Sequence, residues 1–326
     1  MSVAQYLRKF SLIVGPDSGE ARDLSDLRCY FSVRRGDNET PNTADIRVTN
    51  PAPKTVQQAM SSEFTRVVLQ AGYEGNFGAI FDGQIKQTRY GRISSTETYL
   101  DIHAADGDRA YNYSTMAMSL VAGENGKRKA LEAVIGSMAA YGVFQGYVPP
   151  DFPDNPLPRG KVLFGSAKDE MRILARNSLT NWSIQNGKLQ LVPETAYLPG
   201  DVPEINASTG MIGIPEQTQN GIKVRTLLNP VLKIGQAIHL NNSSIQRFRY
   251  PISLNKSKEN DFFDIRNPIN PDGLYYVMVA DYYGDTRGDS WYSDLTCLSV
   301  DATVDPEYMR TQPVGVPIVS AIKRRG

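Results

Sequence analysis

The sequence predicts a mainly β protein with a smaller α+β insertion, and three observations support this. Apolar and polar residues alternate along many short segments, Gly, Pro, Asn and Asp gather between those segments, and one central stretch changes to helical spacing. A two-residue period is typical of strands that bury one face, whereas apolar residues at i, i+3, i+4 and i+7 indicate a helix. The 326 residues exceed the usual size of one core, so we expect several domains.

Residues 1–108 are predicted to form a first antiparallel β-barrel. The segments that carry alternation or short apolar runs are residues 10–14, 29–35, 44–49, 55–60, 64–70, 79–88 and 98–103. Polar or Pro-rich turns separate them, as at 36–42 and 50–53. Six or seven strands are enough to close a barrel, and closure removes exposed strand edges.

Residues 109–203 are predicted to form the α+β insertion. Residues 111–120 and 127–141 carry Ala, Met and Leu at helical spacing, and residues 142–160 are a Pro- and Gly-rich connector that we expect to be extended. We therefore expect two helices and a connector before the next strand.

The clearest local unit of the insertion is a helix followed by a hairpin. Ser166 is a favourable N-cap residue, and Asp169 places a carboxylate in the first turn. Trp182 then begins an alternating run that reaches Asn186-Gly187, a pair favoured in type I′ turns because both positions accept positive φ. We expect Trp182 and this turn to anchor the insertion structurally.

Residues 204–300 are predicted to form a second antiparallel β-barrel. Its strand-like segments are residues 222–228, 237–240, 274–281 and 291–300. The tail at 301–326 combines three prolines, several apolar residues and the basic run 323–325. Because it is too apolar for a solvated linker, we expect it to dock in extended form on a neighbouring subunit or an adjoining protein, and packing on its own second barrel is the alternative.

The composition argues against several classes of function. Thirty-five basic and thirty-five acidic residues balance, so bulk charge does not favour DNA or anionic lipid. His103 and His239 are the only histidines of the sequence, which excludes a three-His zinc site. Cys29 and Cys297 lie in strand-like runs, and we interpret them as buried, reduced thiols. The first ten residues lack an apolar core and no apolar run approaches ~20 residues, so we expect neither secretion nor a membrane span.

Acidic residues form two groups that resemble catalytic or metal sites. The first group is Asp101, Asp106 and Asp108, and the second is Asp285, Asp289 and Asp294. Glycosidase chemistry needs one carboxyl with a raised pKa, and we expect the turn at residues 106–108 to be solvated instead. The second group lacks the periodicity of an EF-hand loop, and we interpret residues 284–288 as a hairpin turn with glycines at positive φ.

The remaining motifs have structural explanations. Ser166 lacks the Gly-x-Ser-x-Gly elbow of an acyl-transfer enzyme. The triplets Arg-Gly-Asp at 35–37 and 287–289 are assigned to turns. The clustered tyrosines could stack sugars or bases, or could fill cores and subunit interfaces, and they are Tyr275, Tyr276, Tyr282, Tyr283 and Tyr292. We therefore predict no catalytic, cofactor-binding or metal-binding residues.

The order of the elements resembles a known family. Residues 72–108 read as the strands of a first barrel, and a Gly-x-Pro turn at 213–215 precedes a strand that ends Leu-Leu-Asn-Pro at 227–230. A strand led by Gly235 and a hairpin around residues 284–288 follow. In this succession the chain is similar to the baseplate hub proteins of contractile-tailed bacteriophages.

This resemblance implies a structural protein without enzymatic activity and without a cofactor. In the family, two barrels per subunit resemble the tail tube protein, and three subunits form a ring that joins the hexameric tube to the trimeric central spike. The implied partners are a homotrimer, the tail tube protein, the spike protein and other baseplate proteins, with the tape-measure protein and DNA in transit through the lumen. The implied location is the virion tail baseplate, assembled in the host bacterial cytoplasm. A tail-associated peptidoglycan or glycan hydrolase and a carbohydrate-binding β-module remain the alternatives.

Overall fold

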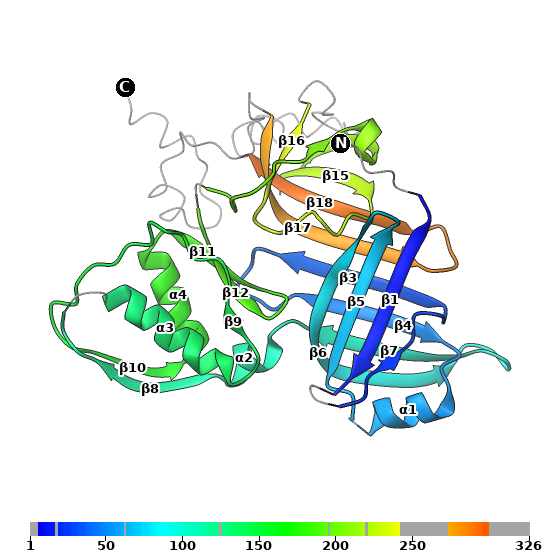
Figure 1. Cartoon of the computed structure of the whole chain (residues 1–326), viewed down its shortest axis with the longest axis horizontal. Helices are drawn as coiled ribbons and strands as arrows, with labels where there is room; N and C mark the ends of the chain where they lie inside the picture. The colour runs from blue at the N-terminus through cyan, green and yellow to red at the C-terminus, as the bar shows by residue number, and fades with distance from the viewer. Residues whose placement is uncertain are drawn as a thin grey trace, which may run out of the picture.

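A curled sheet of thirteen strands dominates the computed structural model, and a smaller α+β module lies beside it (Figure 1). The structure describes residues 6–16, 19–61, 63–123, 126–194, 196–218, 221–241 and 273–299. Neighbouring strands run in the order β14-β15-β18-β17-β3-β4-β7-β6-β5-β1-β2, while β16 pairs with β17 and β13 pairs with β16. The predicted mainly β class is confirmed.

The strands of the sheet come from both ends of the chain. The amino-terminal strands are β1 (Arg8–Gly15), β2 (Arg22–Asp23), β3 (Cys29–Gly36), β4 (Thr43–Thr49), β5 (Arg66–Tyr73), β6 (Asn76–Arg92) and β7 (Thr98–Ala105). The carboxy-terminal strands are β13 (Glu204–Ile205), β14 (Met211–Thr218), β15 (Gly221–Leu227), β16 (Ala237–Leu240), β17 (Leu274–Asp285) and β18 (Trp291–Ser299). A single 3₁₀ turn, Ala207–Thr209, precedes β14.

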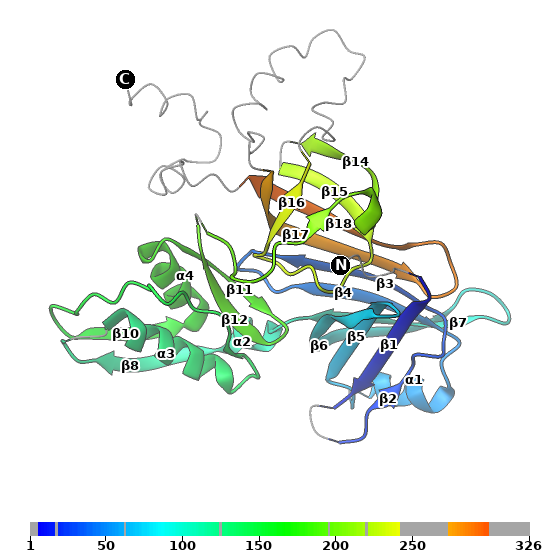
Figure 2. The ribbon, with the colours of Figure 1, turned by 45° about the horizontal axis from the view of Figure 1, so that its top comes forward.

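Main-chain pairing of β3 with β17 joins the two groups of strands. The register runs from Val279 opposite Gly36 to Asp285 opposite Tyr30. Figure 2 shows β17 and β3 side by side at the centre of the curl. The strands of both predicted barrels therefore lie in one continuous sheet.

Side chains hold the curl together where main-chain pairing ends. Among the described strands β1 pairs with β2 and β5, and no ladder returns from β1 to β3. Instead the rings of Phe10 and Phe31 stack with centroids 5.9 Å apart, and Trp291 meets Phe31 edge-on at 5.5 Å. Trp291 Nε1 also donates to the carbonyl of Gly72 at 3.2 Å. The curl is closed by this aromatic cluster, whereas the sequence predicts closure by strand pairing.

Alternation along the strands produces the core of the sheet. In β4, Ala44, Ile46 and Val48 are buried while the residues between them face outward. Phe31 of β3 and Tyr282 of β17 belong to the same buried cluster, which therefore spans both groups of strands. Burial of apolar surface is the main favourable term of folding, so the two groups stabilise each other.

The α+β module has its own core. Its elements are α2 (Asp108–Tyr113), β8 (Thr115–Leu120), α3 (Gly126–Ala139), β9 (Phe144–Gln145), β10 (Lys161–Ser166), α4 (Ala167–Asn177), β11 (Thr180–Gln185) and β12 (Lys188–Pro193). Met138 of α3, Met171 of α4 and Trp182 of β11 are fully or almost fully buried in it. The predicted hairpin is present, with Asn186 at φ 53° and Gly187 at φ 70°, as a type I′ turn requires.

Two predicted elements are wrong and one prediction holds in part. The predicted strand at 55–60 belongs to helix α1 (Pro53–Met60), because proline at the first position loses no helical hydrogen bond. The predicted helix at 111–120 divides into α2 and β8, since β8 finds a pairing partner in β10. Ser166 does precede α4, but its side chain makes no capping hydrogen bond.

One prediction concerns residues that the structure does not describe. The predicted tail at 301–326 lies outside the described residues. No helix in the described ranges is both long and apolar enough to cross a membrane.

Trp182 generates the first testable prediction. Its side chain is 1% exposed and packs against Tyr111, with ring centroids 6.4 Å apart. We expect Trp182→Ala to lower the free energy of unfolding by ~3 to ~5 kcal/mol, because it leaves a cavity. Chemical denaturation followed by circular dichroism measures this.

Two matched variants accompany that measurement. Trp182→Phe keeps an aromatic ring and removes an indole N–H that has no hydrogen-bond partner among the described residues, so it should cost far less. Phe164→Ala changes a residue of the same module that is 80% exposed and should leave stability nearly unchanged. A Trp182→Ala protein as stable as the parent would contradict the structural role.

Candidate functional site: the junctions that join the parts of the chain

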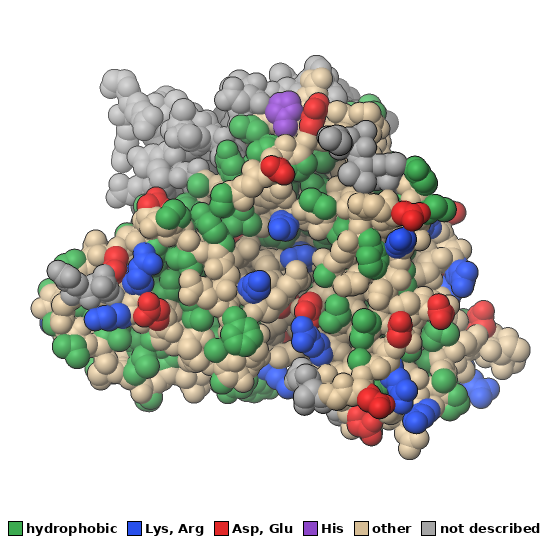
Figure 3. Space-filling model, in the orientation of Figure 1, with side chains coloured by type: hydrophobic (Ala, Val, Ile, Leu, Met, Phe, Trp, Pro, Cys, Tyr) green, Lys and Arg blue, Asp and Glu red, His purple; other side chains and the backbone are tan. Residues whose placement is uncertain are grey.

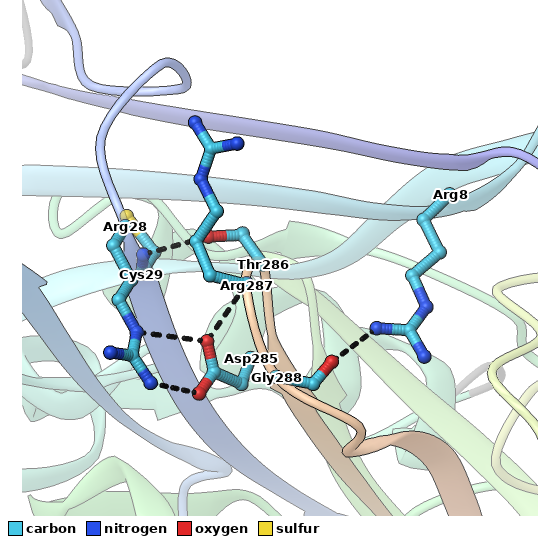
Figure 4. Close-up of polar contacts among 7 residues, drawn as sticks. All are labelled: Arg8, Arg28, Cys29, Asp285, Thr286, Arg287 and Gly288. Carbon is cyan, nitrogen blue, oxygen red and sulfur yellow. Dashed lines mark hydrogen bonds and ion pairs between the residues drawn. The ribbon is translucent and has the colours of Figure 1, made fainter.

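The β17–β18 turn bonds to the start of β3. The Asp285 carboxylate accepts hydrogen bonds from Arg28 Nε at 3.3 Å and Nη2 at 2.8 Å (Figure 4). Thr286 Oγ1 accepts from the backbone N–H of Cys29 at 3.0 Å. The guanidinium beside Asp285 lowers the pKa of that carboxyl below its usual value. The turn is therefore fixed to the strand that neighbours β17.

Arg8 of β1 reaches the same turn from the other side. Its Nη1 donates to the carbonyl of Gly288 at 2.6 Å, as Figure 4 shows. Its guanidinium also lies 5.4 Å from the ring centroid of Trp291, within range of a cation–π contact. This turn thus contacts both β1 and β3 at the place where the curl closes.

The glycines of the turn serve a different purpose from the one predicted. Neither Gly284 nor Gly288 adopts positive φ. A Cβ on Gly284 would lie 2.2 Å from Cζ of Phe31, and a Cβ on Gly288 would lie 2.5 Å from Oδ2 of Asp285. At both positions glycine leaves room for a neighbouring side chain, the ring of Phe31 or the carboxylate of Asp285, and the predicted positive φ is wrong.

A second junction holds the hairpin of the module against the sheet. The two oxygens of Asp106 accept the backbone N–H groups of Asn186 and Gly187, the latter at 2.8 Å. Asp106 is 1% exposed, and burial raises its pKa to about 6, although the two N–H groups and the charge of Arg35 act in the opposite direction. The predicted solvated turn is therefore wrong, because the hairpin covers this carboxylate.

Three further side chains complete this contact. Asn42 Nδ2 donates to the carbonyl of Ile184 at 2.9 Å, and Gln185 Nε2 donates to the carbonyl of Gly36 at 2.9 Å. Arg35 Nη2 donates to Gln185 Oε1 at 3.0 Å. We call Arg35, Asn42, Asp106 and Gln185 the hairpin junction. Its hydrogen bonds are satisfied by partners in both parts, which fixes the module on the sheet.

The hairpin junction was not predicted from the sequence. Asn42 and Gln185 carry no local motif, and Arg35 belongs to one of the Arg-Gly-Asp triplets. Arg35 and Asp37 are 6% and 8% exposed, so this triplet is not presented on the surface of the described structure. The residues that Arg35, Asn42 and Gln185 contact across the junction lie far away in the sequence, so the local sequence pattern contains no signal for these contacts.

Tyr276 and Asp37 form a buried pair beside the junction. The Tyr276 hydroxyl donates to the Asp37 carboxylate. Burial raises the pKa of Asp37 to about 6 and also raises the pKa of Tyr276. Tyr275 and Tyr282 are buried as well, whereas Tyr283 and Tyr292 contact each other on the outer face, with ring centroids 5.3 Å apart. Most of the tyrosine cluster therefore fills the core.

The acidic residues that resemble glycosidase carboxylates are engaged elsewhere. Asp101 binds Arg47 at 2.6 Å, and Asp108 binds Lys86 at 2.9 Å. Asp106 borders a cavity of about 430 Å³ whose described lining includes one other carboxylate, Asp82. Asp82 is held by a salt bridge at 2.6 Å to an arginine, and both Asp106 oxygens accept the hairpin amides. In this arrangement Asp106 holds the hairpin and Asp82 holds the neighbouring strand.

The other candidate metal-binding and catalytic residues lie at separate places in the described structure. Asp285 and Asp294 are each paired with an arginine, and the described residues contain no group of three potential metal ligands. His103 contacts Asp45 on the outer face, while His239 lies on β16. Cys29 and Cys297 are free and buried, as predicted, and burial raises the thiol pKa of both, that of Cys29 to about 12.

Comparison with known proteins supports the fold. No family model and no curated protein matches the sequence. The tail protein from Neisseria meningitidis MC58 aligns over 90% of this chain and 97% of its own, with a TM-score of 0.54 and 9% identity. The 43 kDa tail protein of prophage MuSo2 from Shewanella oneidensis covers the same shares, with a TM-score of 0.57 and 6% identity. A chain of the Francisella PdpA-VgrG complex, half-lidded, aligns over 93% of this chain and 60% of its own, at a TM-score of 0.52 and 7% identity.

At these identities the likeness concerns the fold. The chain has the fold of phage tail proteins, so the resemblance predicted from the sequence is confirmed at that level.

Asp106 generates a prediction about pH. Its pKa is 3.8 as a free side chain and about 6 in the folded protein, so the folded state binds the proton more tightly. The corresponding stability is fully present below pH ~3.8 and is lost as the pH rises through ~6, by about 3 kcal/mol in total. We expect the stability of the parent relative to Asp106→Asn to fall by about 2.4 kcal/mol between pH 4 and 7, measured by urea denaturation.

Asp151→Asn is the matched control, because Asp151 is exposed and lies outside the junction. Its stability curve should follow that of the parent across the same pH range. A parent and an Asp106→Asn protein that differ by a constant amount at every pH would show that Asp106 is not the buried titrating group.

Proposed function

We propose that this chain, which has the fold of phage tail proteins, is a structural baseplate hub protein of the virion tail. Three copies would form a ring that joins the hexameric tail tube to the trimeric central spike, with DNA and the tape-measure protein passing through its lumen. The observation that carries this proposal is the fold match over 90% of this chain and 97% of each of two tail proteins. Other baseplate proteins would be its further partners, and assembly would take place in the host bacterial cytoplasm.

The continuous sheet supports the proposed match between a ring of three chains and a six-fold tail tube. Each chain supplies two groups of strands joined through β3 and β17, so three chains would present six groups to a six-fold tube. A closed ring requires heterologous contacts between unlike surfaces of neighbouring copies. β14 is an edge strand of the sheet, and its residues Ile212 and Ile214 are 40% and 63% exposed. This apolar surface suits burial against a neighbouring copy. In this proposal the apolar segment within residues 301–326 docks on a neighbouring subunit as well.

Oligomeric state tests the proposal. Light scattering should give three times 36.1 kDa, and electron microscopy should show a ring with an axial channel. Ile214→Asp should shift the mass toward one chain and leave the circular dichroism spectrum unchanged, because a charge would have to be buried between copies. Val162→Asp, at a residue 69% exposed on the module, is the matched control and should remain trimeric. A parent that stays a single chain, alone and with tail tube protein, would contradict the ring.

We also propose that the protein is not an enzyme. The carboxylates that resemble a catalytic pair are bound to arginine, lysine or backbone amides, so a glycan would meet no free acid or base among them. Peptidoglycan incubated with the parent or with Asp106→Asn should release no more reducing ends than buffer alone. Hydrolysis by the parent that disappears in Asp106→Asn would support the hydrolase alternative instead.

A further inference from the structure

Strand β8 of the α+β module has one free edge. It forms a two-stranded sheet with β10, and no other described strand pairs with it. Figures 1 and 2 both show these two strands at the margin of the module. On the side of the molecule drawn in Figure 3, mainly hydrophobic and uncharged side chains lie along this lower margin. The main-chain groups of the free edge are therefore open to a partner.

The register of β8 with β10 shows which main-chain groups point outward. The N–H of Ala167 donates to the carbonyl of Ser114 at 3.0 Å, and these two residues continue the register of the ladder. Hydrogen-bonded and non-hydrogen-bonded pairs alternate along an antiparallel ladder. The N–H and C=O groups of Thr115, Ala117 and Ser119 therefore point away from β10, toward the free edge.

This edge lacks the features that keep strand edges from pairing. Bulges, prolines, charges and short length protect edges in natural sheets. The ladder of β8 with β10 is regular, and residues 111–123 include no proline and no charged residue. By contrast, β14 contains a bulge and Pro215, β2 has two residues, and β6 carries Arg89 and Arg92 beyond its pairing with β5. On the other side of the pair, β10 holds Gly165 at φ 119° and runs directly into α4.

Apolar side chains next to the free edge are exposed as well. Met118 shares its face of β8 with the buried Met116, yet it is 43% exposed. Tyr113 just before the strand and Val121 just after it are 65% and 84% exposed. A strand paired with β8 would cover part of this surface, so main-chain bonding and burial of apolar area would act together.

The carboxy-terminal sequence supplies a segment of matching character. Residues 318–322 read Ile-Val-Ser-Ala-Ile, without charge or proline, and their β-branched residues favour strands. Pro317 stands directly before them, where proline is compatible with the start of a strand. The last described residue is Ser299 of β18, and an extended chain from there to residue 318 spans up to ~60 Å. This length is enough to reach the module of an adjoining copy.

We propose that residues 318–322 of a neighbouring copy add to the free edge of β8 as a strand. This proposal rests on the proposed function, in which three copies form a ring. Such a ring needs two unlike surfaces on each copy, and here they would be the edge of the module and the carboxy-terminal segment. The side chains of β10 lie one strand further from the added segment, so Val162 stays outside the contact.

Disulfide cross-linking tests this pairing in the full-length chain. Ala117→Cys places a thiol at the free edge, while the natural Cys29 and Cys297 are buried. It is combined in turn with one change in the segment, namely Ile318→Cys, Val319→Cys, Ser320→Cys, Ala321→Cys or Ile322→Cys. Mild oxidation should give dimers and trimers on non-reducing gels. Because successive side chains of a strand face opposite sides, cross-linking should be more than ~5-fold stronger at alternate positions than at those between them.

Two controls accompany the cross-linking. Ala117→Cys alone reports links between two edges, and Thr96→Cys, at an exposed residue of the β6–β7 turn, should give no alternating pattern with the same five changes. A link within one chain, which keeps the mass of a single copy, would show that the segment packs on its own module and would overturn the proposal. Equal cross-linking at all five positions, or none at any of them, would overturn it too.

Hydrogen exchange gives a second readout without a change in β8. In the double variant Val319→Pro and Ser320→Pro, one proline removes an N–H that would face β8, because successive N–H groups of a strand point to opposite edges. Mass spectrometry should then detect about three more fast-exchanging amides in a peptide spanning residues 114–120, since three N–H groups of β8 point outward. The matched variant Thr311→Pro and Gln312→Pro lies before the segment and should leave this exchange unchanged. Unchanged exchange in the first variant contradicts strand addition.

Failure of the ring would be recognised separately, because light scattering on the same samples reports assembly. A trimer without a link between position 117 and the segment would reject strand addition and retain the ring. Links that join more than three copies into open chains would retain strand addition and reject the ring of three. A parent that stays a single chain, with no link between copies, would reject both.

Discussion

Main-chain pairing between β3 and β17 is the interaction on which the rest of this structure depends. It joins strands from opposite ends of the sequence over the register from Gly36 and Val279 to Tyr30 and Asp285. One buried cluster then extends through both groups of strands, so the two groups share one apolar core. Loss of this ladder would expose two strand edges and divide the apolar core, which makes the sheet one cooperative body.

The junction with the module depends on the same strand. Arg35 and Gly36 end β3, where they meet Gln185 of the hairpin, and Tyr276 of β17 binds Asp37 just beyond. The ladder thus fixes the positions of the groups that receive the module. The buried side chains of Arg35, Asp106 and Gln185 are tolerated here because each has a hydrogen-bond partner across the junction, and such a network requires one relative placement of the two parts.

Much of the fold could be predicted from the local sequence pattern, because alternation and turn conformation are properties of residues that are neighbours in the sequence. Alternation located β4 and β15, and Asn186-Gly187 located the hairpin, since positive φ is a property of the turn itself. Helix α1 was missed because Thr and Val in its sequence favour strands, whereas Pro53 at its start favours a helix.

The candidate site was less predictable because its contacts join distant parts of the chain. Asp106 reads as a solvated residue in an Asp-Gly-Asp turn, and its burial is caused by Asn186 and Gly187, which no short window contains. The residue type alone therefore could not distinguish Asp106 from Asp101. Asp106 is 1% exposed, so its charge is costly to bury and its pKa rises to about 6, even though two backbone N–H groups that donate to it act in the opposite direction. Asp101 lies on the outer face and meets a guanidinium, so its charge neutralises that of Arg47. The same residue type therefore fixes the hairpin to the sheet at Asp106 and balances the charge of an arginine on the surface at Asp101. The two aspartates differ because the folded sheet buries Asp106 and leaves Asp101 on its outer face.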